Sequence, residues 1–426
     1  MSGNVLAMKT TEFRTQLQQT QQRRLAVVRF EEGLRASLPE FQWLAQALES
    51  YPDQLQHEGL FLGIGERSGL LLGAFLHWTF RGPGAGGVRL WPYQELSEYL
   101  TDGMRLALGM GRKNALAGLW WGGGKGVICR PETASFQDPE WRKNAYQDYG
   151  DFVSSLDGCY VTAEDAGTTP PDMAEVFSRT RFTTCIPPEF GGSGNPSGPT
   201  AEGILQAMRA LAEFLGHESL EGLSVAIQGA GQVGSRLAGH LLDQGVGRLL
   251  MSDLERERIP EGAEYVEPDE IFSAEVDLFS PCALGAVLNP RTIPLIKAKG
   301  VCGAANNQLE DPVRDSEALH KRGVVYVPDY VANRMGIVNC ADEQSGRLRD
   351  DPRVQRHLSL DWPEGVYQTV KRILARSAAH QTSPESEAVR LADEAARQMH
   401  PIWGHRANQI ARAVWEKFRE PVLGSV

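Results

Sequence analysis

A glycine-rich turn in the second half of the chain constrains the fold more than any other feature. Residues 228–234 read Gln-Gly-Ala-Gly-Gln-Val-Gly, between an apolar run and a helical pattern, which is the context that a dinucleotide-binding turn requires. The glycines allow a tight turn, close approach of a pyrophosphate and close packing of helix on strand, and the helix N-terminus offers N–H groups to the phosphates. The alternative is a plain tight turn in an α/β domain. We predict a dinucleotide site formed by Gly229, Ala230, Gly231, Gln232, Val233 and Gly234.

An acidic residue follows this turn at the distance that discriminates between nicotinamide cofactors. Asp253 lies 24 residues after Gly229 and ends the next apolar run. A carboxylate there accepts hydrogen bonds from the ribose hydroxyls and repels a 2′-phosphate, which predicts NAD. Arg256 and Arg258 follow closely and leave NADP possible, and Asp253 could also be an ordinary surface residue.

The order of apolar runs predicts an α/β fold. Runs at 223–228, 248–253, 276–281 and 324–331 alternate with helical patterns, which indicates a parallel, doubly wound sheet. Before them, residues 16–38 have the pattern of an exposed amphipathic helix, 60–89 that of strands and 94–117 that of a helix followed by a Gly/Trp turn. The stretch 189–200 is rich in Gly, Pro and Ser and predicts a hinge, after which Thr200 is placed to start a helix.

Composition excludes several classes of protein. A net charge of −11 argues against nucleic acid as a partner. The longest apolar stretch, near residues 70–78, is too short for a membrane span, and the N-terminal residues contain no apolar signal-peptide core. Six cysteines without a C-x-x-C pair indicate a reduced, cytoplasmic protein, and nine histidines without H-x-x-x-H spacing predict no metal site.

Two lysines and a carboxylate pair are the candidates for chemistry. Lys125 lies among glycines and tryptophans with little polar cover, which lowers a lysine pKa and favours a role as a base. A phosphate-binding loop is excluded, because it would need glycine at 119 and Ser or Thr at 126. Lys113 closes a helix, where it could face a substrate carboxylate or simply stabilise the helix C-terminus. Asp165, beside Glu164 at the end of a β-type run, could transfer a proton or cap a turn.

Nine segments in order carry a resemblance to one family: GGVR, GMGRKNALAGL, GGGKGVI, TAEDAGT, PSGPTAEGI, GAGQVG, PCALGAVLN, GAANNQL and PDYVANRMGIVN. Together they resemble the glutamate/leucine/phenylalanine/valine dehydrogenases over about residues 60 to 343, with the spacing of the leucine branch. The resemblance implies NAD(P)-dependent, reversible oxidative deamination of an L-amino acid to a 2-oxo acid and ammonia. It also implies three parts: a substrate and oligomerisation domain (1–195), a Rossmann domain (196–345) and C-terminal helices that return to the first domain (346–426).

The resemblance also implies roles for individual residues. Lys125 matches the catalytic lysine and Asp165 the carboxylate that exchanges protons with the amino group. Lys113 matches the lysine that pairs with the substrate α-carboxylate, and Gly87 a glycine whose backbone approaches the substrate. The positions that match the nicotinamide side are Thr200, Asn306 and Asn333. The family further implies a homo-oligomer, a hexamer or octamer.

The sequence determines the identity of the substrate side chain less closely than it determines the reaction. Glutamate-specific members are expected to carry a lysine where this chain has Ala85 and a serine where it has Cys340, so an apolar pocket for an aliphatic amino acid is expected. However, Arg334 replaces a small residue of the family's N-A-G-G segment. It could pair with surface acids, or it could reach the pocket and bind an acidic substrate, with Arg81 as a second candidate cation.

Three other functions compete with this interpretation. A glutamate dehydrogenase would need a cation for the side chain. A non-catalytic regulatory homologue in a hetero-oligomer would be expected to lack Lys113, Lys125 or Asp165, and all three are present. A hydroxy-acid dehydrogenase would need a catalytic histidine, but His400 and His405 lie in the tail and favour a structural or interface role.

Overall fold

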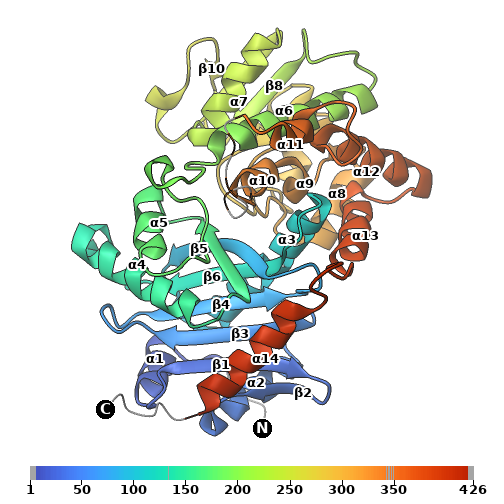
Figure 1. Cartoon of the computed structure of the whole chain (residues 1–426). Helices are drawn as coiled ribbons and strands as arrows, with labels where there is room; N and C mark the ends of the chain where they lie inside the picture. Colours follow the sequence, from blue (N-terminus) through green and yellow to red (C-terminus); the bar gives the residue numbers. More distant parts are fainter. Residues whose placement is uncertain are drawn as a thin grey trace.

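A computed structural model describes residues 6–420 apart from 133, 342, 344, 345, 347 and 349. Figure 1 shows two β-sheets, one built from the N-terminal part of the chain and one from the middle, with the C-terminal helices running from the second sheet back to the first. The predicted α/β class is confirmed. The domain boundaries at 195/196 and 345/346 stay predictions.

The first sheet has seven strands in the order β2-β1-β3-β4-β6-β5-β7. Neighbours run antiparallel from β2 to β6, whereas β5 is parallel to both β6 and β7. The strands are β1 (Arg24–Phe30), β2 (Gly33–Ala36), β3 (His57–Ile64), β4 (Leu71–His77), β5 (Gly84–Trp91), β6 (Gly122–Cys129) and β7 (Tyr160–Glu164). Strands were therefore expected correctly between 60 and 89.

Helices cover both faces of this sheet. Along β1, Leu25 and Val27 join a core with α1, α2 and α3, while Ala26 and Val28 join a second core with α4 and the C-terminal helix α14 (Arg406–Arg419). Alternate side chains of a strand point to opposite faces, so the sheet is buried on both. The helices of this domain are α1 (Thr10–Gln18), α2 (Gln42–Glu49), α3 (Leu96–Leu116), α4 (Pro139–Ser154) and α5 (Pro170–Phe177).

The expectation of one exposed helix over residues 16–38 is wrong. The chain leaves α1 at Gln18 and forms a β1–β2 hairpin, in which Val28 pairs with Arg35. The reason is the run Leu25–Val28, which is buried at every position. Its β-branched residues suit a pleated surface that is covered on both sides, whereas an exposed amphipathic helix would bury only one stripe.

The expected Gly/Trp turn is only partly present. Its tryptophans lie in the connection after α3, but the glycines at 122–124 and 126 begin β6, an interior strand between β4 and β5. A Cβ at Gly122 would lie 2.8 Å from Thr79 Cα, and a Cβ at Gly124 would lie 2.7 Å from Ala85 N. Glycine is thus required because the backbones of neighbouring segments approach β6 closely.

The second sheet is wholly parallel, in the order β10-β9-β8-β11-β12-β13, which confirms the doubly wound interpretation. Its strands are β8 (Ser224–Gln228), β9 (Arg248–Ser252), β10 (Glu264–Tyr265), β11 (Leu278–Pro281), β12 (Gly300–Val301) and β13 (Val325–Tyr326). Hydrophobic cores on its two faces include residues of α6 (Ser197–Phe214) and α7 (Gln232–Asp243) in one case and of α8 (Pro312–Lys321) in the other.

Two boundaries differ from expectation. The run 324–331 ends as a strand at Tyr326, because Pro328 cannot donate a backbone hydrogen bond and precedes the short helix α9 (Asp329–Ala332). Helix α6 begins at Ser197 rather than Thr200. The Asn195 side chain accepts the N–H of Ser197 at 2.9 Å, and Thr200 lies in the first turn.

The C-terminal helices connect the two halves of the molecule. They are α10 (Met335–Ala341), α11 (Pro352–Gln355), α12 (Val366–His380), α13 (Pro384–Ala396) and α14 (Arg406–Arg419). Helix α12 packs on α6, α13 packs on α3, and α14 crosses β1. The predicted return to the first domain is therefore present. No helix in the described part of the chain combines the length and apolarity that a membrane span requires.

Candidate active site

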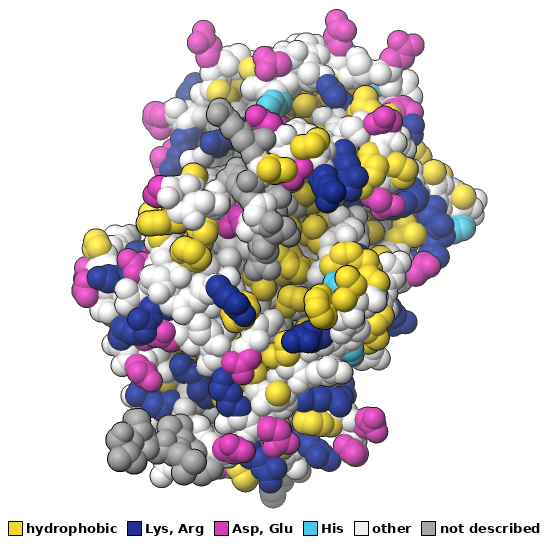
Figure 2. Space-filling model, viewed as in Figure 1, with side chains coloured by type: hydrophobic (Ala, Val, Ile, Leu, Met, Phe, Trp, Pro, Cys, Tyr) yellow, Lys and Arg dark blue, Asp and Glu magenta, His cyan; other side chains and the backbone are white. Residues whose placement is uncertain are grey.

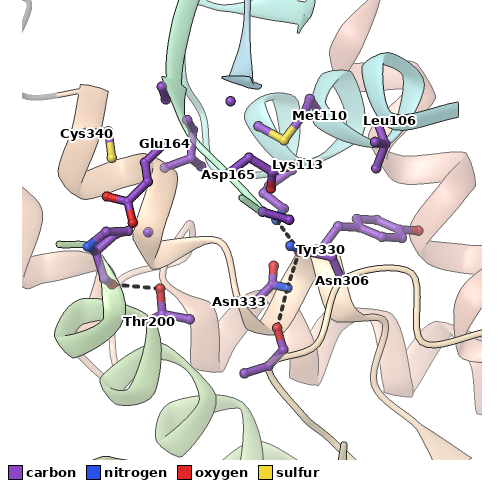
Figure 3. A pocket seen from close by; sticks show the side chains of 18 of the residues that line it. Leu106, Met110, Lys113, Glu164, Asp165, Thr200, Asn306, Tyr330, Asn333 and Cys340 are labelled. Atoms are coloured by element: carbon purple, nitrogen blue, oxygen red, sulfur yellow. Dashed lines mark hydrogen bonds between the residues drawn. The ribbon is translucent and has the colours of Figure 1, made fainter. Parts of the chain in front are cut away.

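A cavity of about 290 Å³ lies between the two domains (Figure 3). In Figure 2, hydrophobic side chains are visible along the line where the domains meet. The predicted site residues that line the cavity are Gly87, Lys113, Lys125, Asp165, Thr200, Val233, Asn306, Asn333 and Cys340. The fold thus brings residues that are far apart in the sequence to one cavity.

Lys125 and Asp165 form the ion pair at the centre of the site. Lys125 projects from β6 and is buried, and its Nζ lies 2.7 Å from Oδ2 of Asp165, which directly follows β7. Burial lowers the pKa of Lys125, and the charge of Asp165 opposes that shift. Burial by itself would raise the pKa of Asp165, but Lys125 and Arg89 outweigh it and hold that pKa at about 2. The carboxylate is therefore ionised at neutral pH, beside a lysine that loses its proton more easily than usual.

Gly87 lies on β5 directly against the Asp165 side chain. A Cβ at position 87 would come 2.8 Å from Cβ of Asp165. Any other residue would displace the carboxylate or fill the cavity, so the glycine keeps the backbone of β5 accessible at this point.

Lys113 spans the cleft from the last turn of α3. Its Nζ donates to Oδ1 of Asn306 at 3.1 Å, and the same oxygen accepts a hydrogen bond from Asn333 at 2.9 Å (Figure 3). Burial lowers the pKa of Lys113 to about 8, against the opposing charge of Asp329. The network connects the substrate domain to the loops that follow the strands of the Rossmann sheet.

Glu164 is a carboxyl group of the cavity to which the sequence assigned no role of its own. Figure 3 places its side chain on the cavity wall, on the same side as Thr200. Burial raises its pKa to about 7, and its Oε2 is buried without a hydrogen-bond partner among the described residues. The group therefore changes its charge close to neutral pH.

The two residues predicted for side-chain specificity are placed differently. Cys340 lines the cavity, and its sulfur lies 2.7 Å from the sulfur of Cys185. Ala85 is not among the lining residues, because it is buried in a small cluster with Trp121, Val161 and Ile337. Its methyl group lies behind the wall to which Ile337 contributes.

Neither candidate arginine reaches the cavity. Arg81 stacks 4.3 Å from the Trp120 ring centroid and donates to the backbone oxygens of Leu119 and Ala395. Arg334 is fully buried and turns towards α12, so both expectations for it, a surface ion pair and a place in the pocket, are wrong. Lys113 and Lys125 are the only cationic side chains among the described lining residues.

The glycine-rich turn has the geometry that a dinucleotide requires. Gly229 has φ +103°, and a Cβ at Gly234 would collide with the Gly229 carbonyl. In contrast, a Cβ at Gly231 would meet nothing within 4 Å, so the backbone is open at the N-terminus of α7. Free N–H groups and the positive end of the helix dipole fit a pyrophosphate at this position.

Asp253 lies beside the same turn. Its carboxylate accepts the N–H of Ala230 at 2.8 Å and that of Glu255 at 3.0 Å. The two nearby arginines have other partners: Arg258 pairs with Glu255, and Arg256 lies 4.7 Å from the Tyr265 ring centroid. An acid rather than a free guanidinium therefore lies next to the dinucleotide turn.

Several lining residues carried no sequence signal of their own. They include the apolar residues Leu106, Met110, Ala163, Cys185 and Ile337. Ala163 could have been found, because it precedes the Glu164–Asp165 pair at a strand end. Cys185 and Ile337 could not, since only tertiary packing brings them to the cavity. No group of three or more His, Cys, Asp or Glu side chains within the described ranges is arranged to hold a metal ion.

Comparison with known proteins identifies relatives of this site. Residues 74–182 match the Glu/Leu/Phe/Val dehydrogenase dimerisation domain, and residues 248–392 match the Glutamate/Leucine/Phenylalanine/Valine dehydrogenase model. The chain is 40% identical to a leucine dehydrogenase of Geobacillus stearothermophilus over 355 residues, which cover 82% of this chain and 92% of that protein. It is 39% identical to a valine dehydrogenase of Streptomyces coelicolor over 362 residues, 82% of this chain and 95% of that one.

The fold is also similar to that of solved structures. The crystal structure of L-tryptophan dehydrogenase from Nostoc punctiforme superimposes with a TM-score of 0.66 at 32% identity. The match covers 80% of this chain and 96% of the Nostoc protein.

Proposed function

The chain belongs to the glutamate/leucine/phenylalanine/valine dehydrogenase family, and we propose that its substrate is an aliphatic L-amino acid and its cofactor NAD. As a member of the family it is an amino-acid dehydrogenase, which catalyses reversible oxidative deamination. The observation that carries the proposal is a cavity that combines the Lys125–Asp165 pair with an apolar wall. Among the residues that the structure describes, Lys113 and Lys125 are the only cations that line it.

Lys113 is the proposed partner of the substrate α-carboxylate. Its cationic Nζ lies at the cleft, and its bond to Asn306 can be exchanged for a charged acceptor. Thr200, Asn306 and Asn333 lie on the Rossmann side of the cavity, where they would contact the nicotinamide ring. Gly229 to Gly234 would hold the pyrophosphate, and Asp253 the adenosine ribose.

Proton transfer is the proposed work of Lys125 and Asp165. A bound nicotinamide supplies the acceptor for a hydride from the substrate Cα. Asp165, being ionised, takes a proton from the substrate ammonium group. Neutral Lys125 then removes a proton from the water that adds to the substrate imine carbon, and returns a proton to the departing ammonia. Burial of both groups in the cleft excludes bulk water and fixes their orientation.

The substrate proposal rests on the partners available to a side chain. Ala163, Ile337, Cys340 and Met110 give an apolar wall that suits leucine or valine. A glutamate side chain would bring a second carboxylate into this wall, next to Glu164, and no described side chain of the wall is a cation that could pair with it. An unpaired buried carboxylate costs on the order of a few kcal/mol, or two or more decades in efficiency.

The cofactor and assembly proposals rest on fewer observations. NAD is favoured by Asp253 and by the engaged state of Arg256 and Arg258. A homo-oligomer, hexameric or octameric as in the family, is favoured by the match of residues 74–182 to a dimerisation domain. A cytoplasmic location is proposed because all six cysteines are free thiols.

An absorbance assay for NADH formation tests the proposal directly. A panel of L-amino acids is assayed with NAD and with NADP, and leucine or valine with NAD is expected to give the highest kcat/KM. Lys125→Ala is expected to lower turnover by orders of magnitude while NADH binding, followed by fluorescence, is retained. Higher efficiency on glutamate than on leucine would contradict the substrate proposal, and near-normal turnover of Lys125→Ala would contradict the mechanism.

A further inference from the structure

Arg89 is a charged residue beside the reacting groups that the mechanism above does not use. It follows Gly87 by two positions on β5, so its side chain lies on the face of the sheet towards which a Cβ at Gly87 would point, the face that carries Asp165. Its Nε donates to Oδ2 of Asp165 at 3.1 Å, the same oxygen that Lys125 contacts. The side chain of Arg89 is only 20% exposed.

This contact leaves one oxygen of Asp165 for the substrate. Lys125 and Arg89 both hold Oδ2, and within the described part of the chain no side chain donates to Oδ1. A carboxylate that is anchored through one oxygen keeps a fixed orientation and presents the other to the cavity. The amino group of a substrate is the donor that this oxygen would receive.

A second carboxylate fixes Arg89 itself. Nη1 of Arg89 donates to both oxygens of Asp102 on α3, at 3.0 and 3.1 Å. Asp102 also accepts the hydroxyl of Tyr93, which follows β5. Arg89 is thus clamped between Asp165 and Asp102, and the series Tyr93–Asp102–Arg89–Asp165 ends at the proposed proton acceptor.

The charges around Lys125 explain what this clamp does. Among the described residues, the charged groups that act on Lys125 are Asp165 directly after β7, Arg89 from β5, and Asp102 and Lys113 from α3. The negative charge of Asp165 by itself would stabilise the protonated form of Lys125 and so raise the pKa of Lys125. Arg89 shares the charge of Asp165 and adds a repulsion, so the neutral form of Lys125 becomes accessible without protonation of Asp165.

We propose that Arg89 is a positioning residue of the deamination reaction, which orients Asp165 and keeps it ionised so that Lys125 can act as a neutral base. The inference rests on the proposed roles of Lys125 and Asp165. Asp102 is the residue that holds Arg89 in place.

The pH dependence of kcat/KM for oxidative deamination tests this role. Activity requires neutral Lys125, so it falls as the pH drops below the Lys125 pKa. Arg89→Gln removes a positive charge, raises that pKa and moves the acidic limb upward by about one pH unit. On the limb, kcat/KM is then about tenfold lower than in the parent, and it recovers at higher pH. Arg89→Lys retains the charge and is expected to keep the limb within about 0.3 pH unit of the parent.

A second variant removes a charge of the opposite sign, which separates an electrostatic effect on the pH profile from damage to the fold. Asp102→Asn removes a negative charge from the same network but keeps a side-chain oxygen that can accept the hydrogen bond of Arg89. Arg89 therefore stays in place, and the acidic limb is expected to move to lower pH or to stay where it is. Damage to folding would lower activity at every pH in both variants. Arg67→Gln is the matched control, because Arg67 is clamped between Asp148 and Asp151 in the same domain and does not line the cavity.

The outcomes distinguish this inference from the proposed function. A parent enzyme that oxidises no amino acid would overturn the proposed function. An active parent whose acidic limb is unchanged in Arg89→Gln, or moves upward equally in Asp102→Asn or Arg67→Gln, would overturn the role of Arg89 alone. If Arg89→Gln does not fold, the comparison of Arg89→Lys with Asp102→Asn still decides, because an upward shift in Asp102→Asn contradicts the proposal.

Discussion

At the scale of single residues, Arg334 is a buried arginine that forms no salt bridge with a carboxylate of the residues that the structure describes. It donates to the carbonyl oxygens of Leu116 and Glu364 and to Oγ1 of Thr369 at 3.1 Å. Burial lowers its pKa to about 9. These acceptors belong to the end of α3 and to the start of α12, so Arg334 joins the substrate domain to the C-terminal helices. Its place next to Asn333 in the sequence does not make it a substrate contact.

Arg334→Met should therefore affect stability and leave specificity unchanged. Methionine retains most of the volume, but the carbonyls of Leu116 and Glu364 lose their donor. We expect the free energy of unfolding to fall by about 2–4 kcal/mol in chemical denaturation. The ratio of leucine to glutamate efficiency should stay within about twofold of the parent. Arg291→Met, at an exposed position, is the control. A collapse of that ratio in Arg334→Met would show that Arg334 senses the substrate.

Catalytic residues could be predicted because their chemistry shows in sequence. Lys113, Lys125 and Asp165 each stand in a distinctive local context, and the structure brings all three to one cavity. The pocket wall could not be predicted, since an apolar residue such as Ile337 looks the same whether it lines a cavity or fills a core. The two predictions for Arg334 failed for a related reason, because tertiary contacts set the direction in which a side chain points.

At the scale of elements, local sequence patterns predicted the helices and the parallel strands correctly. They failed where tertiary packing determines the secondary structure. The helix over 94–117 and the strands of the Rossmann sheet follow their hydrophobic periodicity. The β1–β2 hairpin and the glycine strand β6 do not, because one is buried on both faces and the other is defined by the close approach of its neighbours. Residues 16–38 fit a helical period, which predicts burial of one side only, whereas β1 within this segment is buried on both faces.

The turn between β8 and α7 makes a prediction about the cofactor. Asp253→Asn removes the negative charge and retains an oxygen that can accept the N–H of Ala230. Because a 2′-phosphate then meets no repulsion, the efficiency with NADP relative to NAD should rise by about tenfold or more. Steady-state kinetics with both cofactors gives the ratio.

Its control is Asp277→Asn. Asp277 lies next to β11 in the same sheet and also accepts a backbone N–H, from Ser224 at the start of β8. The cofactor ratio should be unchanged in this variant. A parent that already prefers NADP, or an Asp253→Asn ratio equal to the parent's, would rule out Asp253 as the discriminating residue.

At the scale of the whole molecule, the C-terminal segment holds the two domains around the cleft. Arg112 on α3 pairs with Asp393 on α13 at 2.9 Å, and His405 contacts Glu58 on β3 at 3.1 Å. His400 donates its N–H to Phe80. Figure 1 shows the chain passing from α13 to α14, which crosses the first sheet. The family resemblance implied these returning helices, but the surface on which they dock depends on contacts between residues more than 280 positions apart in the sequence.

Trp415 on α14 is the residue through which this docking can be tested. Its ring is 7% exposed and packs edge-on to Phe30 at 5.2 Å, and its Nε1 donates to the carbonyl of Arg35 at 2.9 Å. Trp415→Ala removes a large buried ring and leaves that carbonyl without its donor. The free energy of unfolding should fall by about 3–5 kcal/mol.

The stability of Trp415→Ala should fall while its turnover number, kcat, stays unchanged. Trp415 does not line the cavity, so kcat at a temperature where the variant is folded should stay within about twofold of the parent. Glu416→Ala, on the exposed side of the same helix, should change stability by less than about 0.5 kcal/mol. Chemical denaturation and steady-state kinetics measure the two quantities. A large loss of kcat in folded Trp415→Ala would mean that α14 controls the geometry of the cleft, whereas an unchanged stability would mean that the first domain does not depend on the returning helix.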